Sequence, residues 1–129
     1  MPISYQRDDR KKRITSVSTG TITLAAVLAV VDRQWEDGAW EYGVLYDSRL
    51  VESEPEPDEM ELMLAHVQSI AGGRRRGPVA LVTSQDRLFR LFRVYSFSGK
   101  YAEITTDVRA FRDLAAADAW LDERLGLGV

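Results

Sequence analysis

His66 is the only histidine in this 129-residue chain, so a histidine-based catalytic or metal site would have to be built around it. On a helix, a partner for such a site would stand four residues away, where the chain has Leu62 and Ile70. The chain also lacks cysteine, which excludes thiol nucleophiles, thiolate metal sites and disulfides. We therefore predict that His66 is an ordinary half-buried histidine, and that the protein binds no metal and needs no cofactor.

Two other patterns lack the context that chemistry requires. Gly72 and Gly77 have the spacing of the glycines in a phosphate-binding loop, but no Lys-Ser or Lys-Thr ends the motif, and the stretch precedes an expected strand instead of following one. The adjacent acids Asp8 and Asp9 point in different directions on a turn, so they do not form an acid/base pair. We therefore expect a protein that is not an enzyme.

The composition is that of an ordinary globular protein, with 45% apolar and 29% charged residues. The length is close to the commonest domain size, so we expect residues 1–129 to form one domain. A net charge of −3 offers no field to attract nucleic acid, and the longest apolar run, residues 24–31, is far shorter than the roughly 20 residues that span a membrane. We expect no nucleic-acid binding, no membrane span and, without a signal peptide or cysteine, a cytoplasmic protein.

The stretch over residues 77–97 sets the expected architecture. Residues 79–82 form a short apolar run that is typical of a strand buried on both faces of a parallel sheet. After Ser84, which can cap a helix, the apolar positions 88, 91, 92 and 95 recur at helical spacing. A buried strand that leads directly into an amphipathic helix is half of a βαβ unit.

Similar patterns predict a hairpin and three further helices. Residues 3–19 fit the hairpin, whose basic run at 10–13 either protects a sheet edge with charge, which we favour, or contacts a phosphate. Thr23 and Asp113 are placed to cap two helices. The third helix carries an apolar face over residues 60–71, is preceded by an acidic exposed loop, and stops at glycine.

Residues 42–47 and an extended run over 102–111 predict two more strands. The basic loop at 73–76 is either solvated, which we favour, or an anion site. The element order is then β-β-α-β-α-β-α-β-α, with five strands and four helices. Such an order requires right-handed crossovers between parallel strands. The sequence therefore predicts an α/β fold.

Three segments resemble the STAS, or SpoIIAA-like, family in its uncharacterised bacterial branch: GTITLAAVLAVVD at 20–32, GPVALVTSQDRLFRLFRVYSF at 77–97 and VRAFRDLAAADAWL at 108–121. The resemblance covers nearly the whole chain. It implies a sheet of about five strands, mostly parallel with an antiparallel edge strand, and helices packed against it. Better-known members antagonise anti-sigma factors or act as regulatory modules, so the resemblance implies a non-enzymatic regulatory or protein-interaction module.

Some members of that family are switched by phosphorylation of a serine in an Asp-Ser motif at the start of the second helix. In this chain Asp47-Ser48 follows the strand expected at 42–47, and Ser53 lies among glutamates that would repel a phosphate. We therefore do not transfer the phosphorylation site to Ser53. Ser48 is kept as a phosphorylation candidate, although a structural role in a turn is favoured.

The helix expected after Ser84 carries an unusual stripe on its outward side. Phe89, Arg93 and Phe97 recur at i, i+4 and i+8, away from the buried face, and aromatic and arginine residues are enriched at interface centres. We predict that this stripe contacts a second copy of the chain, as a homodimer, or another protein partner. The competing interpretation ends the helix near Ser96, so that Phe97 folds back onto the core and Phe89 tucks under a neighbouring helix.

A carrier of small molecules or lipids is the alternative function, because the wider fold group includes lipid-transfer domains. Tyr42, Val44 and Tyr46 share one face of the expected strand at 42–47. They either help to close a shallow apolar pocket or take part in ordinary packing, which we favour. A small-molecule ligand is therefore kept as an alternative to a protein partner.

Overall fold

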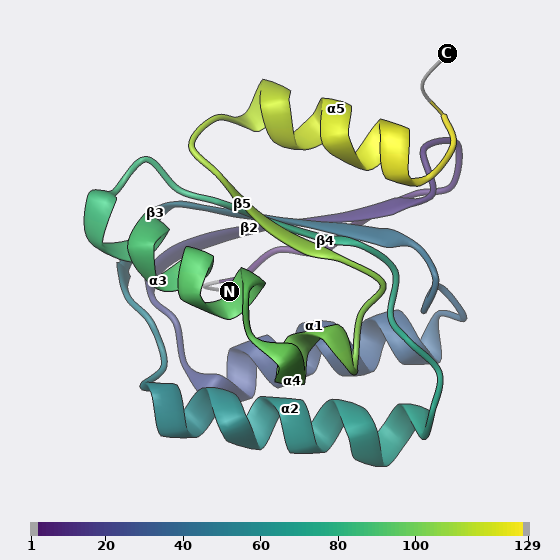
Figure 1. The fold of residues 1–129 in the computed structure, drawn as a ribbon, viewed down its shortest axis with the longest axis horizontal. Coiled ribbons are helices and arrows are strands. Elements are labelled where there is room, and N and C mark those ends of the chain that lie inside the picture. Colours follow the sequence, from purple (N-terminus) through teal and green to yellow (C-terminus); the bar gives the residue numbers. More distant parts are fainter. Residues whose placement is uncertain (1–2, 128–129) are drawn as a thin grey trace.

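The computed structural model describes residues 3–127 and shows a mixed five-stranded sheet with helices on both faces (Figure 1). The strands lie side by side in chain order: β1 (Gln6–Asp8), β2 (Arg13–Thr21), β3 (Gly43–Ser53), β4 (Val79–Val82) and β5 (Val108–Phe111). The helices are α1 (Leu24–Glu36), α2 (Pro57–Ala71), α3 (Asp86–Ser96), α4 (Gly99–Ala102) and α5 (Leu114–Arg124). Only the β1–β2 pair is antiparallel among these strands, which confirms the expected α/β class and the antiparallel edge.

The structure contains one helix more than the four expected from the sequence, and the additional one is α4. The prediction of an extended run from residue 102 is wrong, because the strand begins only at Val108. Tyr101 and Ile104 are both buried, and a helical turn with a hydrogen bond from Thr105 N to Tyr101 O (3.1 Å) directs them inward. Burial of two large side chains three residues apart therefore decides the local conformation.

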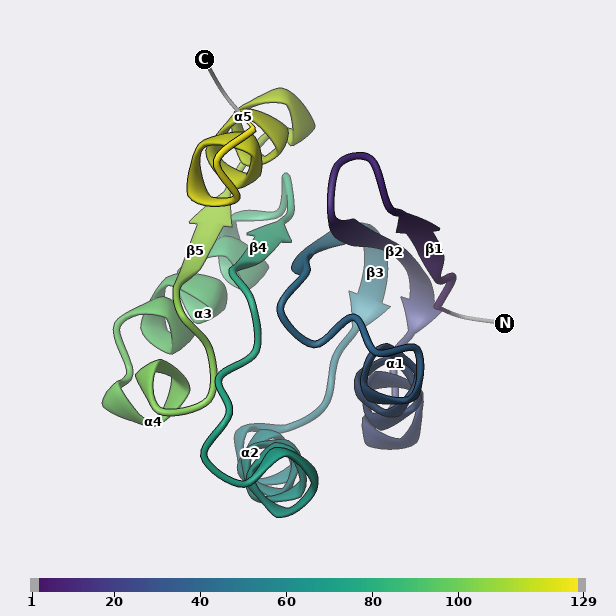
Figure 2. The same ribbon diagram turned by 90° about the vertical axis from the view of Figure 1, so that its right-hand side faces the viewer.

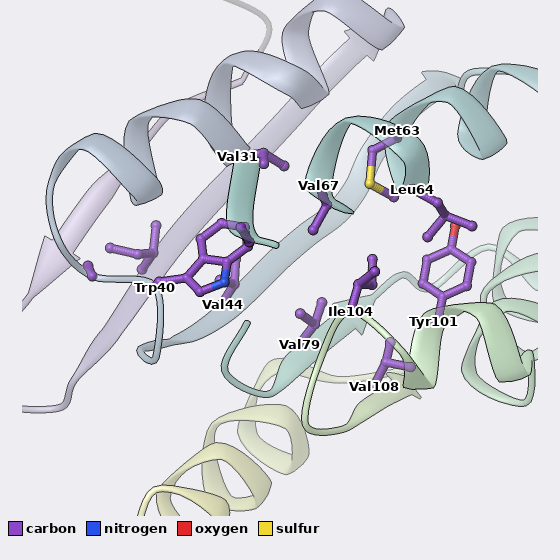
Figure 3. Packing of buried hydrophobic residues seen from close by; sticks show 13 residues of the cluster. Val31, Trp40, Val44, Met63, Leu64, Val67, Val79, Tyr101, Ile104 and Val108 are labelled. Atoms are coloured by element: carbon purple, nitrogen blue, oxygen red, sulfur yellow. The ribbon is translucent and has the colours of Figure 1, made fainter. Parts of the chain in front are cut away.

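The two faces of the sheet support separate cores, because alternate residues of a strand point in opposite directions. Val44 of β3 and Val79 of β4 pack with Val31 and Val67 beneath α1 and α2 (Figure 3). Their neighbours in sequence face α5 and belong to a second cluster, made of Leu45, Ala80, Val82, Phe111, Ala117, Trp120 and Leu121. Four helices thus cover one face and α5 alone covers the other, as the edge-on view shows (Figure 2).

β3 is longer than the predicted strand at 42–47. It continues through Asp47 and Ser48 to Ser53, so the expectation that Asp47-Ser48 follows the strand is wrong. The extension pairs with β2 as far as Thr21 opposite Ser53, and it buries Val51. Long-range pairing with β2 therefore outweighs the acidic, loop-like composition of this segment.

Three helix ends follow the sequence closely, whereas α3 begins after Gln85 and not after Ser84. The Thr23 side chain accepts a hydrogen bond from Ala26 N (3.2 Å) and starts α1, while Asp113 accepts one from Ala116 N (2.8 Å) and starts α5. Gly72 ends α2 with a φ of 60°, a backbone conformation that favours glycine. Local capping chemistry therefore determines these boundaries.

Gly77, directly before β4, packs against the backbone of the loop that precedes β3. A Cβ at this position would lie 2.2 Å from the carbonyl oxygen of Tyr42, and Gly77 N donates to Trp40 O (2.9 Å). No other residue type fits without a shift of the backbone. The close approach therefore fixes where the chain enters β4.

We expect Gly77→Ala to destabilise the protein by about 3 kcal/mol, because the added methyl group collides with main-chain atoms that cannot rotate away. Gly73→Ala is the matched control, since nothing lies within 4 Å of a Cβ there. Urea unfolding followed by circular dichroism measures both. Equal stabilities of the two variants would contradict the close approach.

Candidate functional site

An apolar cavity of about 120 Å³ lies between the sheet and the helices on its more heavily covered face. On the side of the sheet and α1, the cavity is lined by Ile3, Ser18, Ile22, Val27, Tyr46, Ser48, Val51, Val79, Leu81 and Val108. The other sides contribute Glu54, Pro55, Met60, Met63, Arg76, Leu88, Leu91, Phe92, Tyr95, Tyr101, Ile104 and Thr105. Figure 3 shows part of this wall, with Met63, Tyr101, Ile104 and Val108 directed toward one another. A partly open cavity with such a lining suits an apolar molecule.

Two tyrosines meet at the cavity wall. Tyr95 of α3 and Tyr101 of α4 stack with ring centroids 5.2 Å apart. Both hydroxyl groups are buried, and neither has a hydrogen-bond partner among residues 3–127. Burial raises the pKa of both hydroxyls above the usual tyrosine range, and the pKa of Tyr101 most. At neutral pH each is therefore an uncharged, unused hydrogen-bonding group.

Arg76 lines the same cavity and is only 5% exposed. Its Nε donates to Gln34 Oε1 (2.5 Å) and its Nη2 donates to Tyr46 Oη (2.9 Å). The guanidinium lies 5.6 Å from the ring centroids of both Trp40 and Tyr46. Because all these neighbours are uncharged, Arg76 carries a buried positive charge into the lining.

The prediction of a solvated basic loop is wrong for Arg76, although its neighbours Arg74 and Arg75 are exposed. The main chain holds Arg76 inward, since Arg76 N donates to Ile104 O (2.8 Å) and Thr106 N donates to Arg76 O (2.9 Å). The only signal in the sequence was the position of Arg76 immediately before Gly77, which leads into a buried strand.

Gln34 completes the polar wall behind Arg76. It is fully buried on α1. Its amide nitrogen donates to Ala39 O (2.9 Å), so its amide oxygen is free to accept from Arg76. The buried polar side chain is therefore satisfied and orients the guanidinium.

His66 lies outside the cavity and pairs with an acid that the sequence did not suggest. Its Nε2 lies 2.6 Å from Asp32 Oδ1, joining α2 to α1, and both side chains are half-buried. Among the residues that the structure describes, no group of three or more histidine or acidic side chains could hold a metal ion. The contact thus links two helices.

The sequence matches no family model, and no curated protein matches it. Among solved structures, the fold resembles the crystal structure of an uncharacterised protein from Shewanella loihica PV-4, which is described as a member of the DUF3478 family with a SpoIIAA-like fold. The TM-score is 0.58 over 92% of this chain and 91% of that chain. This protein has a SpoIIAA-like fold. At 16% identity the likeness establishes the fold alone, which confirms the architecture implied by the sequence resemblance.

On this SpoIIAA-like fold, Ser48 does not occupy an exposed turn. It lies within β3, is 8% exposed, and lines the cavity. A kinase would reach its hydroxyl only after this part of the strand left the sheet. Phosphorylation of Ser48 stays a prediction, and burial disfavours it.

The stripe on α3 is only partly exposed. Phe97 is 78% exposed and Arg93 stacks on it, with the guanidinium carbon 5.7 Å from the ring centroid. Phe89 is half-buried beneath Arg112, at 4.3 Å. The helix ends at Ser96, as the competing interpretation expected, but the expectation that Phe97 folds back onto the core is wrong. The outward surface near the end of α3 therefore consists of Val94, Arg93 and Phe97.

No helix within residues 3–127 has the length and apolar character needed to cross a membrane.

We expect the tyrosines of the cavity to differ in their contribution to stability. Tyr101→Phe removes a hydroxyl without a partner and is expected to change the free energy of unfolding by less than about 1 kcal/mol. Tyr46→Phe leaves Arg76 Nη2 without its acceptor and is expected to cost about 2 kcal/mol. Chemical unfolding at pH 7 measures the free energy of unfolding of both variants. A larger loss for Tyr101→Phe than for Tyr46→Phe would contradict this hydrogen-bond assignment.

Proposed function

We propose that this protein is a non-enzymatic binding module of the STAS type that holds a small, mostly apolar molecule between its sheet and helices α2, α3 and α4. The cavity carries the proposal. Its volume is about 120 Å³, and its lining is apolar apart from a few placed polar groups, the usual character of a ligand site.

The size of the cavity limits the ligand. An engineered apolar protein cavity of about 150 Å³ holds a benzene molecule. A space of about 120 Å³ therefore suits a single ring or a short alkyl chain, with larger molecules extending through the opening. The ligand class supported is a small apolar body, not a complete membrane lipid.

An empty cavity of this size also has an energetic cost. Cavity volume costs about 24 cal/mol per Å³, so roughly 3 kcal/mol of stability is lost when the site is empty. A bound apolar molecule restores the missing contacts and offsets that loss. Binding to the folded state is therefore favoured by packing alone.

We expect native mass spectrometry of protein purified from cells to show a non-covalent adduct that disappears under denaturing conditions. Leu91→Trp, which places a larger side chain in the cavity wall, is expected to abolish the adduct. Leu62→Trp is the matched control, because Leu62 is exposed on α2 and outside the lining. A wild-type protein without an adduct, or a Leu91→Trp variant that keeps it, would count against the cavity as the site.

A protein-interaction role is the second candidate, and the exposed end of α3 supports it. Val94 is 65% exposed and Phe97 is 78% exposed, while Leu88 and Phe92 on the buried side of the same helix line the cavity. We propose a contact between two copies of the chain, because in a two-fold dimer the same patch meets itself and Phe97 would pack against its counterpart. Helix α3 would then join the ligand site to the contact surface.

We expect Val94→Ser combined with Phe97→Ser to convert such a dimer into a monomer, as measured by light scattering at high protein concentration. The melting temperature of the monomer is expected to stay nearly unchanged, because both side chains are already exposed to solvent. Phe92→Ser is the contrasting control, since Phe92 is buried and its loss is expected to unfold the protein. A wild-type chain that remains monomeric at high concentration would exclude the homodimer.

A further inference from the structure

The cavity wall contains two charged side chains, Glu54 and Arg76. They differ in how their charges are compensated. Glu54 pairs with Arg87 of α3 through both carboxylate oxygens, and the Oε2 contact measures 3.1 Å. The negative charge at the cavity is therefore already neutralised by a neighbouring guanidinium.

Arg76 has no such partner. It forms no ion pair with any acid among residues 3–127, and Nη1 donates no hydrogen bond to a described residue. A buried charge is costly unless an opposite charge and hydrogen bonds compensate it. The guanidinium therefore presents a positive edge at Nη1, without a partner among the described residues, in the lining of an apolar space.

A purely structural role accounts for only part of this arrangement. Through Nε and Nη2, Arg76 links Gln34 of α1 to Tyr46 of β3, and its Cζ lies 5.6 Å from the centroids of two aromatic rings. Those contacts satisfy donors and favour a cation, but they supply no negative charge. The missing component is an anion that the cavity can admit.

We propose that the ligand of this cavity is an amphipathic carboxylate, whose carboxylate accepts hydrogen bonds from Arg76 while its apolar body lies among Leu88, Phe92 and Val108. This inference rests on the binding function proposed above and adds the chemical class of the ligand. The planar fork of a guanidinium matches a planar carboxylate. A single cation also balances a single negative charge, which favours a carboxylate over a phosphate carrying nearly two.

The test compares three probes of equal chain length, hexanoate, 1-hexanol and hexylamine, titrated into the full wild-type chain at pH 7. Nuclear magnetic resonance follows the backbone amides of Leu88 and Phe92 and the side-chain Nε–H of Arg76. We expect hexanoate to bind about tenfold more tightly than 1-hexanol, or better, because hydrogen bonds to charged groups are worth at least that factor. Hexanoate is also expected to shift the Arg76 resonance, and hexylamine is expected to bind most weakly.

Arg76→Met introduces an apolar side chain of similar length and so removes the charge. We expect it to abolish the preference for hexanoate over 1-hexanol. If this variant does not fold, Arg76→Lys serves in its place, because it keeps the charge but loses the fork, and an intermediate preference for hexanoate is expected.

The outcomes separate the two proposals. Equal affinity of the wild type for hexanoate and 1-hexanol would overturn the carboxylate inference and leave the apolar binding function standing. A preference for hexylamine would also overturn it, by assigning recognition to Glu54 instead. Binding of none of the three probes would overturn the binding function itself, and with it the inference.

Discussion

The close packing of the Gly77 backbone against the loop before β3 is the constraint on which the rest of this structure depends. It lets Gly77 N bond to Trp40 O, aligns β4 beside β3, and places Arg76 beneath the sheet instead of in solvent. The bridge from Arg76 to Thr105 then sets the path of the chain toward β5. A single position without a side chain thus fixes the close approach of the chain entering β4 to the loop before β3, next to the buried Arg76.

The cavity itself follows from the unequal layers of the fold. On one face α5 packs directly on β3, β4 and β5, and the small Ala117 allows close contact. On the other face, helices α1 and α2 pack together, whereas α3 lies against β5 and apart from them (Figure 2). Tyr101 and Ile104, carried by α4 and the turn after it, reach into the space between these two groups. The space is therefore a consequence of how the helices are spread over the sheet, and its wall comes from segments far apart in sequence.

The sequence predicted those features whose causes are local. The apolar run at 79–82, the helical spacing of α3, and the caps at Thr23 and Asp113 each depend on residues within one turn or one strand, and each was found. The burial of Arg76 was missed because its partners, Gln34 and Tyr46, lie 42 and 30 residues away. Likewise, helical periodicity predicted Phe89 on the outward side of α3, but Phe89 is half-buried beneath Arg112, a contact that the periodicity cannot reveal.

Arg76 would couple the proposed binding to folding. A guanidinium held by Gln34, Tyr46 and the ring of Trp40 is fixed in position before any ligand arrives, so little conformational entropy would be lost when an anion binds. The same fixed charge lowers the stability of the empty state, because burial removes it from water without giving it a counter-charge. An arrangement that is costly for the empty fold and preorganised for an anion is expected of a recognition group.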